Sequence, residues 1–160
     1  MVSLSIVIPI YNEENLIFDL VARLDATRES MDKRGIVSSN DLEIIFVNDG
    51  SRDQGFSLLL DICQQRDNFK IINLSRNYGH QYAISAGMNE AVGDAVVVMD
   101  GDLQDPPEFI AELYLKMREG YDVVYAVRRK RVGEGWFKLA TAAIYYRMIR
   151  RLAQINIPMN

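Results

Sequence analysis

The residues with the clearest chemical potential lie in one short stretch, from Ala95 to Glu108. Five apolar residues, mostly valine, run directly into Asp100, Gly101 and Asp102. This pattern is typical of a strand that is buried on both faces and ends in a polar site. Two carboxylates separated by one glycine can converge on Mg²⁺ or Mn²⁺, together with phosphate oxygens. The same residues also form ordinary turns after strands, so both interpretations stay open.

Alternating strands and helices must position these acids. Apolar runs predict strands at 4–10, 42–47, 70–74, 95–99 and 122–127. Apolar side chains at helical spacing predict helices over about 53–66, 81–91 and 106–119, and a first helix that Asn12 could cap. The polar segment 25–40 predicts a frayed helix end and a loop. The chain is therefore expected to be an α/β domain with a mostly parallel central sheet flanked by helices.

The helix that follows the acid run carries its own start signal. Asp105 is placed to be its N-cap, Pro106 its first residue, and Glu108 the second half of a capping box. Gly120 is expected to end this helix.

Polar side chains follow the predicted strands at their carboxyl ends. They are Tyr11-Asn12-Glu13, Asn48-Asp49, Arg76-Asn77, Asp100 to Asp102, and Arg128-Arg129. Ligands of parallel sheets bind beyond this edge, so the pattern predicts one shared cleft. Neither a dinucleotide-binding fingerprint nor a P-loop is present. A phosphate would therefore be held by a cation on Asp102 and Asp100 with basic side chains nearby, which favours a nucleoside diphosphate as leaving group.

Composition excludes several classes of protein. The 160 residues suffice for one domain with a core, and there is no low-complexity tract or repeat. The single cysteine, Cys63, fits a core or surface residue of a reduced compartment better than a nucleophile. No apolar run approaches the roughly 20 residues that span a bilayer, and no secretory signal pattern is present, so a cytoplasmic location is expected.

Charge is unevenly distributed along the chain. Residues 1–127 carry 10 basic and 21 acidic side chains, a net −11, whereas 128–151 carry 8 basic and 1 acidic, a net +7. The basic segment is the part that could meet an anion. No pattern points to nucleic acid.

Four motifs, in order, resemble family 2 of the glycosyltransferases, which have the GT-A fold. They are Pro9-Ile10-Tyr11-Asn12-Glu13, Val47-Asn48-Asp49-Gly50-Ser51, Ser75-Arg76-Asn77-Tyr78-Gly79, and Asp100-Gly101-Asp102-Leu103-Gln104-Asp105-Pro106-Pro107-Glu108. The last motif, with Arg76-Asn77, is similar to the polyprenyl-phosphate sugar transferases, the branch of dolichyl-phosphate mannose synthase and the bacterial undecaprenyl-phosphate glucosyltransferases. The resemblance covers essentially the whole chain.

The resemblance implies roles at matching positions. The implied nucleotide-binding residues are Pro9, Tyr11, Asn12, Glu13, Asn48, Asp49, Asp100 and Gly101. Asp100 and Asp102 would surround the metal and the diphosphate, and Gln104 would be a further metal contact. Asn48 replaces the first acid of the common Asp-Asp-Gly-Ser; it can hydrogen-bond a base or ribose, but it weakens a charge-based role.

Other candidates have two interpretations each. Arg128 joins Asp100 and Asp102 as a catalytic candidate, while Arg76, His80, Asp105 and Arg131 could contact the acceptor or a phosphate. His80 could instead be a structural or surface residue, Asp105 and Asn12 helix caps, Asp49 a turn residue, and the 128–131 run a solvated loop.

The implied reaction is metal-dependent, inverting transfer of a hexose from a UDP- or GDP-sugar to a polyprenyl phosphate. Residues 1–135 would be the nucleotide-sugar-binding catalytic domain. Residues 136–160 would start with an amphipathic helix whose basic face suits an anionic membrane surface, or whose apolar face packs on the domain. The protein is then expected at the cytoplasmic membrane. Resembling proteins continue further, usually into transmembrane helices, so a C-terminal part is expected to be missing here.

Three alternatives remain from the sequence. The chain could be a nucleotide-sugar-binding module without turnover, or a family 2 transferase that acts on a saccharide hydroxyl. A phosphoacceptor signalling domain also has acids at strand ends, but it would want a lysine where Arg128 stands, and it does not explain Tyr11-Asn12-Glu13. The sequence leaves open whether the chain forms a homo-oligomer.

Overall fold

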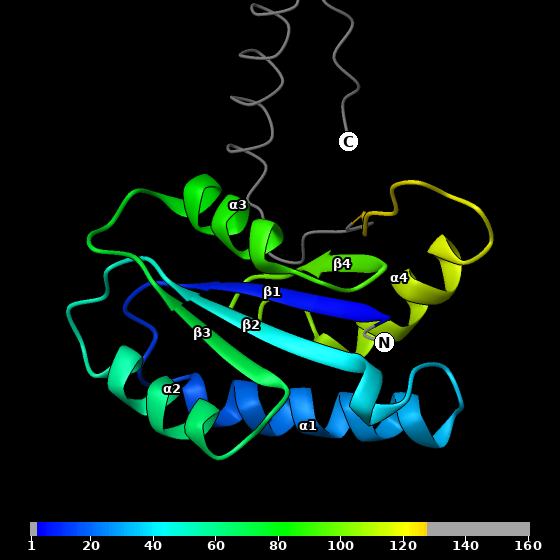
Figure 1. The fold of residues 1–160 in the computed structure, drawn as a ribbon, viewed down its shortest axis with the longest axis horizontal. Coiled ribbons are helices and arrows are strands. Elements are labelled where there is room, and N and C mark those ends of the chain that lie inside the picture. The colour runs from blue at the N-terminus through cyan, green and yellow to red at the C-terminus, as the bar shows by residue number, and fades with distance from the viewer. Residues whose placement is uncertain (1–2, 128–160) are drawn as a thin grey trace, which may run out of the picture. The chain divides into compact units, whose positions relative to one another are not determined.

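The computed structural model describes residues 3–127 (Figure 1). In chain order, the elements are β1 (Leu4–Ile10), α1 (Ile17–Lys33), β2 (Leu42–Asn48), α2 (Gly55–Gln64), β3 (Phe69–Asn73), α3 (His80–Glu90), β4 (Ala95–Val98) and α4 (Ile110–Met117). Short 3₁₀ turns occupy Ser39–Asp41 and Pro107–Phe109. The chain divides into one compact unit over Met1–Tyr125 and a second over Ala126–Asn160. The predicted domain boundary at residue 135 lies outside the described residues.

The four strands form one parallel sheet in the order β3-β2-β1-β4. β1 is the register partner of both β2 and β4, with Leu4 opposite Leu42 on one side and Ala95 on the other. Because all four strands run the same way, their carboxyl ends share one edge. The predicted α/β fold with a parallel sheet flanked by helices is confirmed.

The sheet is buried on both sides by helices, as Figure 1 shows, with α1 and α2 on one face and α3 on the other. On the first face, Ile6, Ile8 and Phe46 belong to the larger core with the apolar side chains of α1, α2 and α4. On the second face, Val7 and Val47 pack with Ala83 of α3. Successive side chains of the central strands thus point alternately into the two cores. Because both faces are buried, apolar residues occur at nearly every position of these strands.

Helix α1 is longer than predicted. The segment from residue 25 was expected to fray, but α1 continues to Lys33. Thr27 and Met31 are buried and extend the apolar face of the helix by two further turns. Burial against the core outweighs the polar composition of this segment.

β4 and the predicted fifth strand differ from expectation. Among residues 3–127, β4 is at the edge of the sheet, and Val96 and Val98 are 37% and 38% exposed rather than buried on both faces. The segment 122–127 forms no strand in this part of the chain, with Val123 and Tyr125 77% and 78% exposed. A β-prone sequence forms a strand only where a neighbouring strand pairs with it.

The helix after the acid run begins later than predicted. Pro106 is extended (φ −67°, ψ 129°) and is the N-cap of the 3₁₀ turn Pro107–Phe109, whereas α4 itself begins at Ile110 with Phe109, not Asp105, in the N-cap position. The ring of Pro107 disfavours helical geometry at the residue before it. The Glu108 carboxylate accepts hydrogen bonds from Arg23 of α1 at 3.3 and 2.8 Å, a partner that the local pattern did not predict.

No helix within the described residues is long and apolar enough to cross a membrane. The predicted amphipathic helix at 136–153 lies outside the described residues.

Candidate functional site

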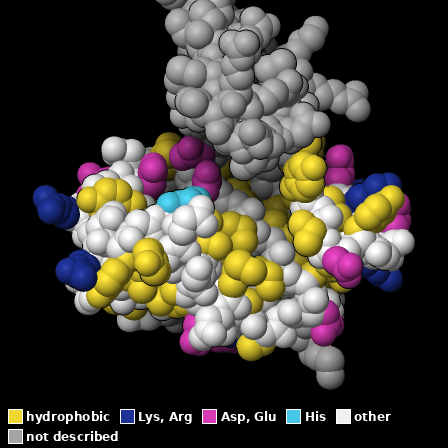
Figure 2. Space-filling model, turned by 90° about the horizontal axis from the view of Figure 1, so that it is seen from above, with side chains coloured by type: hydrophobic (Ala, Val, Ile, Leu, Met, Phe, Trp, Pro, Cys, Tyr) yellow, Lys and Arg dark blue, Asp and Glu magenta, His cyan; other side chains and the backbone are white. Residues whose placement is uncertain are grey.

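A cleft of about 440 Å³ opens at the carboxyl edge of the sheet. It is lined by Pro9, Ile10, Tyr11, Glu13, Asp49, Asn77, Gly79, His80, Ala83, Asp100, Gly101 and Asp102. These residues come from the exits of all four strands and from the start of α3. The view onto α3 shows acidic side chains gathered beside the histidine (Figure 2). The exits of strands that are far apart in the sequence therefore build one cleft. It lies at the edge where a parallel sheet brings all of its carboxyl ends together.

The Asp100-Gly101-Asp102 turn is tightly packed against the exit of β1. A Cβ on Gly101 would overlap Cδ1 of Ile10 and lie 3.4 Å from the carbonyl oxygen of Pro9, so no larger residue fits without movement. The Asp102 carboxylate accepts the backbone N–H of Gln104 at 2.9 Å. Between them, Leu103 has φ 57°, a conformation that L residues rarely adopt. The turn is thus held in one backbone conformation that faces both acids to the cleft.

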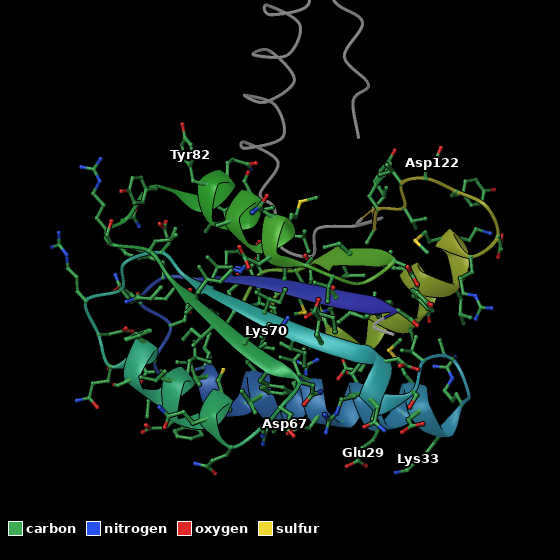
Figure 3. The ribbon with its side chains drawn as sticks, viewed as in Figure 1. Glu29, Lys33, Asp67, Lys70, Tyr82 and Asp122 are labelled. Carbon is green, nitrogen blue, oxygen red and sulfur yellow. The ribbon has the colours of Figure 1, made fainter. Side chains whose placement is uncertain are left out.

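The opposite wall of the cleft starts at helix α3. Nε2 of His80 lies 3.4 Å from Oδ1 of Asp100. Both side chains are about half exposed, at 52% and 53%. Tyr82, two residues further along the helix, points outward from α3 and is 69% exposed (Figure 3). His80 is therefore the α3 side chain that faces the acid turn.

The cleft is acidic. Burial raises the pKa of Glu13, and the nearby carboxylates of Asp102 and Asp53 raise it further. No lysine or arginine of the described residues is among its lining residues. An incoming anion would therefore meet carboxylates rather than compensating cations.

The two loops after β1 and β2 bind one another. The Asn12 side chain accepts the N–H of Arg52 at 2.8 Å, and the N–H of Asn12 donates to the Ser51 hydroxyl at 3.0 Å. Asn12 has φ 55° and does not cap a helix: α1 begins at Ile17, after Leu16 as N-cap. The predicted cap is wrong because the carboxamide is used between loops.

A second reciprocal pair lies beside the first. The N–H of Glu14 donates to the Asp53 carboxylate at 2.9 Å, and the Glu14 carboxylate accepts the N–H of Gln54 at 2.8 Å. Together, these bonds fix the loop that carries Tyr11 and Glu13 into the cleft.

The two polar residues at the end of β2 are both buried. Asn48 donates to the Asn73 side chain at 2.7 Å and accepts the N–H of Ser51 at 3.2 Å; it does not line the cleft. Asp49 does line it, and its carboxylate accepts the backbone N–H groups of Tyr78 and Gly79 at 2.7 and 2.9 Å. These side chains connect neighbouring strand exits.

The remaining predicted site residues lie elsewhere. The Arg76 guanidinium sits 4.8 Å from the centre of the Tyr78 ring, and Arg76 does not line the cleft. Gln104 and Asp105 are exposed on the loop after the acid turn, and they too are absent from the lining. Arg128 and Arg131 lie outside the described residues.

Asn77 lines the cleft, as its place among the polar strand exits predicted. Sequence reasoning did not single out Ile10, Gly79 and Ala83 as cleft residues. Ile10 and Gly79 stood in two of the four motifs, so their positions at the end of β1 and after β3 were the available signal. Ala83 gave none, since an apolar residue at the edge of a core looks the same as one inside it.

Comparison with known proteins identifies the family. The family described as Glycosyl transferase family 2 matches residues 5–160. The chain belongs to glycosyl transferase family 2. This family 2 chain is 49% identical over 156 residues to the uncharacterized glycosyltransferase YkcC of Bacillus subtilis (strain 168), covering 98% of this chain and 46% of YkcC. It is 40% identical over 147 residues to the undecaprenyl-phosphate 4-deoxy-4-formamido-L-arabinose transferase of Enterobacter sp. (strain 638), covering 91% and 42%. It thus spans less than half the length of these relatives.

Solved structures agree with the GT-A fold. Staphylococcus aureus TarS 1-349 in complex with UDP-GlcNAc superposes with a TM-score of 0.53 at 25% identity, covering 70% of this chain and 32% of TarS. The mannosyltransferase PcManGT from Pyrobaculum calidifontis, in complex with GDP-Man and Mn²⁺, gives 0.52 at 22% identity, covering 68% and 30%. The predicted membership of glycosyltransferase family 2 is confirmed.

Proposed function

We propose that this family 2 chain is the donor-binding part of an enzyme that transfers a hexose from a nucleotide-diphosphate sugar to a polyprenyl phosphate, with inversion. The observation that carries the proposal is the meeting of Asp100, Gly101 and Asp102 with Tyr11 and Glu13 in one cleft. The similarity to the Enterobacter undecaprenyl-phosphate 4-deoxy-4-formamido-L-arabinose transferase supports the choice of acceptor.

Donor recognition is assigned to the β1 exit. Pro9, Tyr11 and Glu13 line one side of the cleft, and Gly101 lets the acid turn approach them closely. Tyr11 is 40% exposed, so its ring offers a face for a nucleobase. The Glu13 carboxylate can accept a ribose hydroxyl. Asn12 and Asn48 would assist donor binding indirectly, because their hydrogen bonds fix the loops that carry the binding residues.

A divalent cation fits the donor set. Within residues 3–127, no three or more His, Cys, Asp or Glu side chains are grouped as a complete metal site. Mg²⁺ and Mn²⁺ do not require one, since one or two carboxylates with water and substrate phosphates suffice. Asp100 and Asp102 would hold the ion, and Gln104 would join only if its loop moved toward the cleft. An ion there would also offset the repulsion between the acidic cleft and a diphosphate.

The chemistry follows from these assignments. An acceptor phosphate oxygen attacks the anomeric carbon and forms a new C–O bond, while the bond from that carbon to the diphosphate breaks on the opposite face. The nucleoside diphosphate leaves with the electron pair of the broken bond, and a bound cation stabilises the charge that develops on it. A phosphate monoester is already anionic near neutral pH, with a second pKa of about 6. The acceptor therefore needs no general base.

The decisive experiment measures binding and turnover separately in the full chain. Calorimetry with UDP, GDP and their hexose conjugates, with and without Mn²⁺, should show metal-dependent binding of one nucleotide. Asp102→Asn should abolish this dependence and lower turnover about 100-fold or more. Asp61→Asn removes an exposed carboxylate of α2 and is the matched control, expected to be unchanged. Full activity of Asp102→Asn would remove the metal from the mechanism.

The acceptor is tested by offering polyprenyl phosphate and a free saccharide in parallel. Product on the lipid phosphate alone supports the proposal. Product on a saccharide hydroxyl would reassign the acceptor, and nucleotide binding without any product would identify a binding module. We further propose a peripheral membrane contact through 136–153, outside the described residues. Sedimentation with anionic vesicles tests it, and no binding would count against it.

A further inference from the structure

Asp49 is the most completely bonded acid of the cleft. It is 3% exposed. Its Oδ1 accepts the N–H of Tyr78 at 2.7 Å, and its Oδ2 accepts the N–H of Gly79 at 2.9 Å. Hydrogen bonds to an ionised carboxylate are about twice as strong as neutral ones. Each oxygen is therefore committed to the backbone of a loop about 30 residues away.

The next residue brings the same two loops into direct contact. Gly50 has φ +67°, which glycine adopts readily. A Cβ at this position would overlap the backbone of Arg76 and would lie 2.5 Å from the nitrogen of Asn77. Asp49 and Gly50 thus join the exit of β2 to the Arg76–Gly79 loop by hydrogen bonds and by backbone packing.

Some residues of this loop line the cleft, and others do not. Asn77, Gly79 and His80 line the cleft. Arg76 and Tyr78 do not, and Arg76 stacks 4.8 Å from the centre of the Tyr78 ring. The Tyr78 hydroxyl lies 3.1 Å from that of Ser75, so the outer side of the loop is ordered as well. The two N–H groups that Asp49 holds belong to the two residues just before His80.

We propose that Asp49 is a positioning residue: through the backbone of Tyr78 and Gly79, it sets His80 opposite Asp100. The 3.4 Å separation of His80 Nε2 and Asp100 Oδ1 is the result of this arrangement. The family resemblance would instead make Asp49 a direct ligand of the nucleobase. The effect of Asp49 on donor binding rests on the proposed function, whereas its effect on His80 does not.

The chain contains one histidine, so the imidazole signals of His80 in an NMR spectrum are unambiguous once any affinity tag is removed. Asp49→Asn keeps the shape of the side chain but turns an NH₂ group toward a backbone N–H. In the ligand-free variant, the His80 signals should move from their wild-type positions, and exchange of the Tyr78 and Gly79 amide hydrogens should accelerate about tenfold or more. Asp61→Asn makes the same chemical change at an exposed position of α2 and should move neither.

Two results would overturn the proposal. One is an Asp49→Asn variant with unmoved His80 signals and weakened nucleotide binding, which is the behaviour of a direct ligand. The other is fast exchange of the Tyr78 and Gly79 amides in the wild-type protein, a measurement that does not depend on any variant folding. Gly50→Ala approaches the same loop without a change of charge and should also displace the His80 signals.

Nucleotide binding by the wild-type protein keeps the two proposals separate. If wild type binds neither UDP nor GDP but Asp49→Asn displaces His80, the donor assignment fails and the positioning role stands. If wild type binds nucleotide and Asp49→Asn leaves His80 in place, the donor assignment stands and the positioning role fails.

Discussion

The Ser5 hydroxyl on β1 donates a hydrogen bond to the carboxylate of Glu43, its register partner on β2. This carboxylate also accepts the N–H of Val92 at 2.8 Å and pairs with Lys70 of β3 at 2.7 Å. Glu43 is 3% exposed, and the group lies toward the amino ends of the strands, away from the cleft. A buried charge thus connects three strands and the loop before β4.

Replacing this charge should destabilise the fold. Glu43→Gln keeps the shape but weakens the bonds to Ser5, Val92 and Lys70. We expect a loss of about 1 to 3 kcal/mol in the free energy of unfolding, measured by urea denaturation. Glu29→Gln is the matched control: Glu29 pairs with Lys33 on the exposed face of α1 (Figure 3) and should change stability by about 0.5 kcal/mol or less. Equal effects of the two changes would contradict the assignment.

The Glu43 group also predicts a pH dependence of stability. Burial opposes ionisation, but the bonds from Lys70, Ser5 and Val92 outweigh it, so the pKa of Glu43 lies below its ordinary 4.5. A lowered folded-state pKa stabilises the protein fully above 4.5 and progressively less as the pH falls below it. The stability difference between wild type and Glu43→Gln should therefore shrink in urea melts below this pH. A stability difference that grows below this pH would mean that folding raises the pKa of Glu43, contrary to this prediction.

The acid turn has a steric requirement that can be tested by compensation. Gly101→Ala places a methyl group on Cδ1 of Ile10, which is 1% exposed and cannot turn away. We expect at least about tenfold weaker nucleotide binding and a stability loss of about 1 to 3 kcal/mol. Ile10→Val removes Cδ1, so the double variant should regain much of both. An additive double variant would show that the contact is not the cause.

Cys63 should be unreactive in the folded state. Burial raises the pKa of its thiol to about 11, and the nearby charge of Arg66 lowers it only in part. The thiolate fraction at neutral pH should be about 300-fold below that of a free cysteine with a pKa of about 8.5. Reaction with a disulfide reagent should accordingly be slow in buffer and fast in denaturant. Rapid labelling of the folded protein would contradict this.

The elements themselves could be predicted because each strand is an apolar run between polar turns. The predicted bounds of the strands at residues 4, 42 and 70 lie within one residue of β1, β2 and β3. The cleft could be predicted as well, since parallel strands place their exits at one edge. Tyr11, Glu13, Asp49, Asp100 and Asp102 accordingly meet there.

What failed depended on partners far along the chain. Asn12 was predicted to cap a helix, but it bonds to Arg52, 40 residues away. The capping-box prediction for Glu108 likewise gave no sign of its pair with Arg23, 85 residues before it. The local sequence suggests only partners a few residues away. It does not reveal a partner that is distant along the chain and close in space.

The sequence by itself determined the α/β class and the parallel sheet, and it predicted the edge at which the cleft opens, because hydrophobic periodicity is a local property and strands that alternate with helices pair in parallel. Only the tertiary structure decided how each polar side chain is used. Asp49 is bound to the backbone of Tyr78 and Gly79 because two strand exits touch, and His80 faces Asp100 because that loop is fixed. Hydrogen-bonding groups have several possible partners, and the packing of the core selects among them.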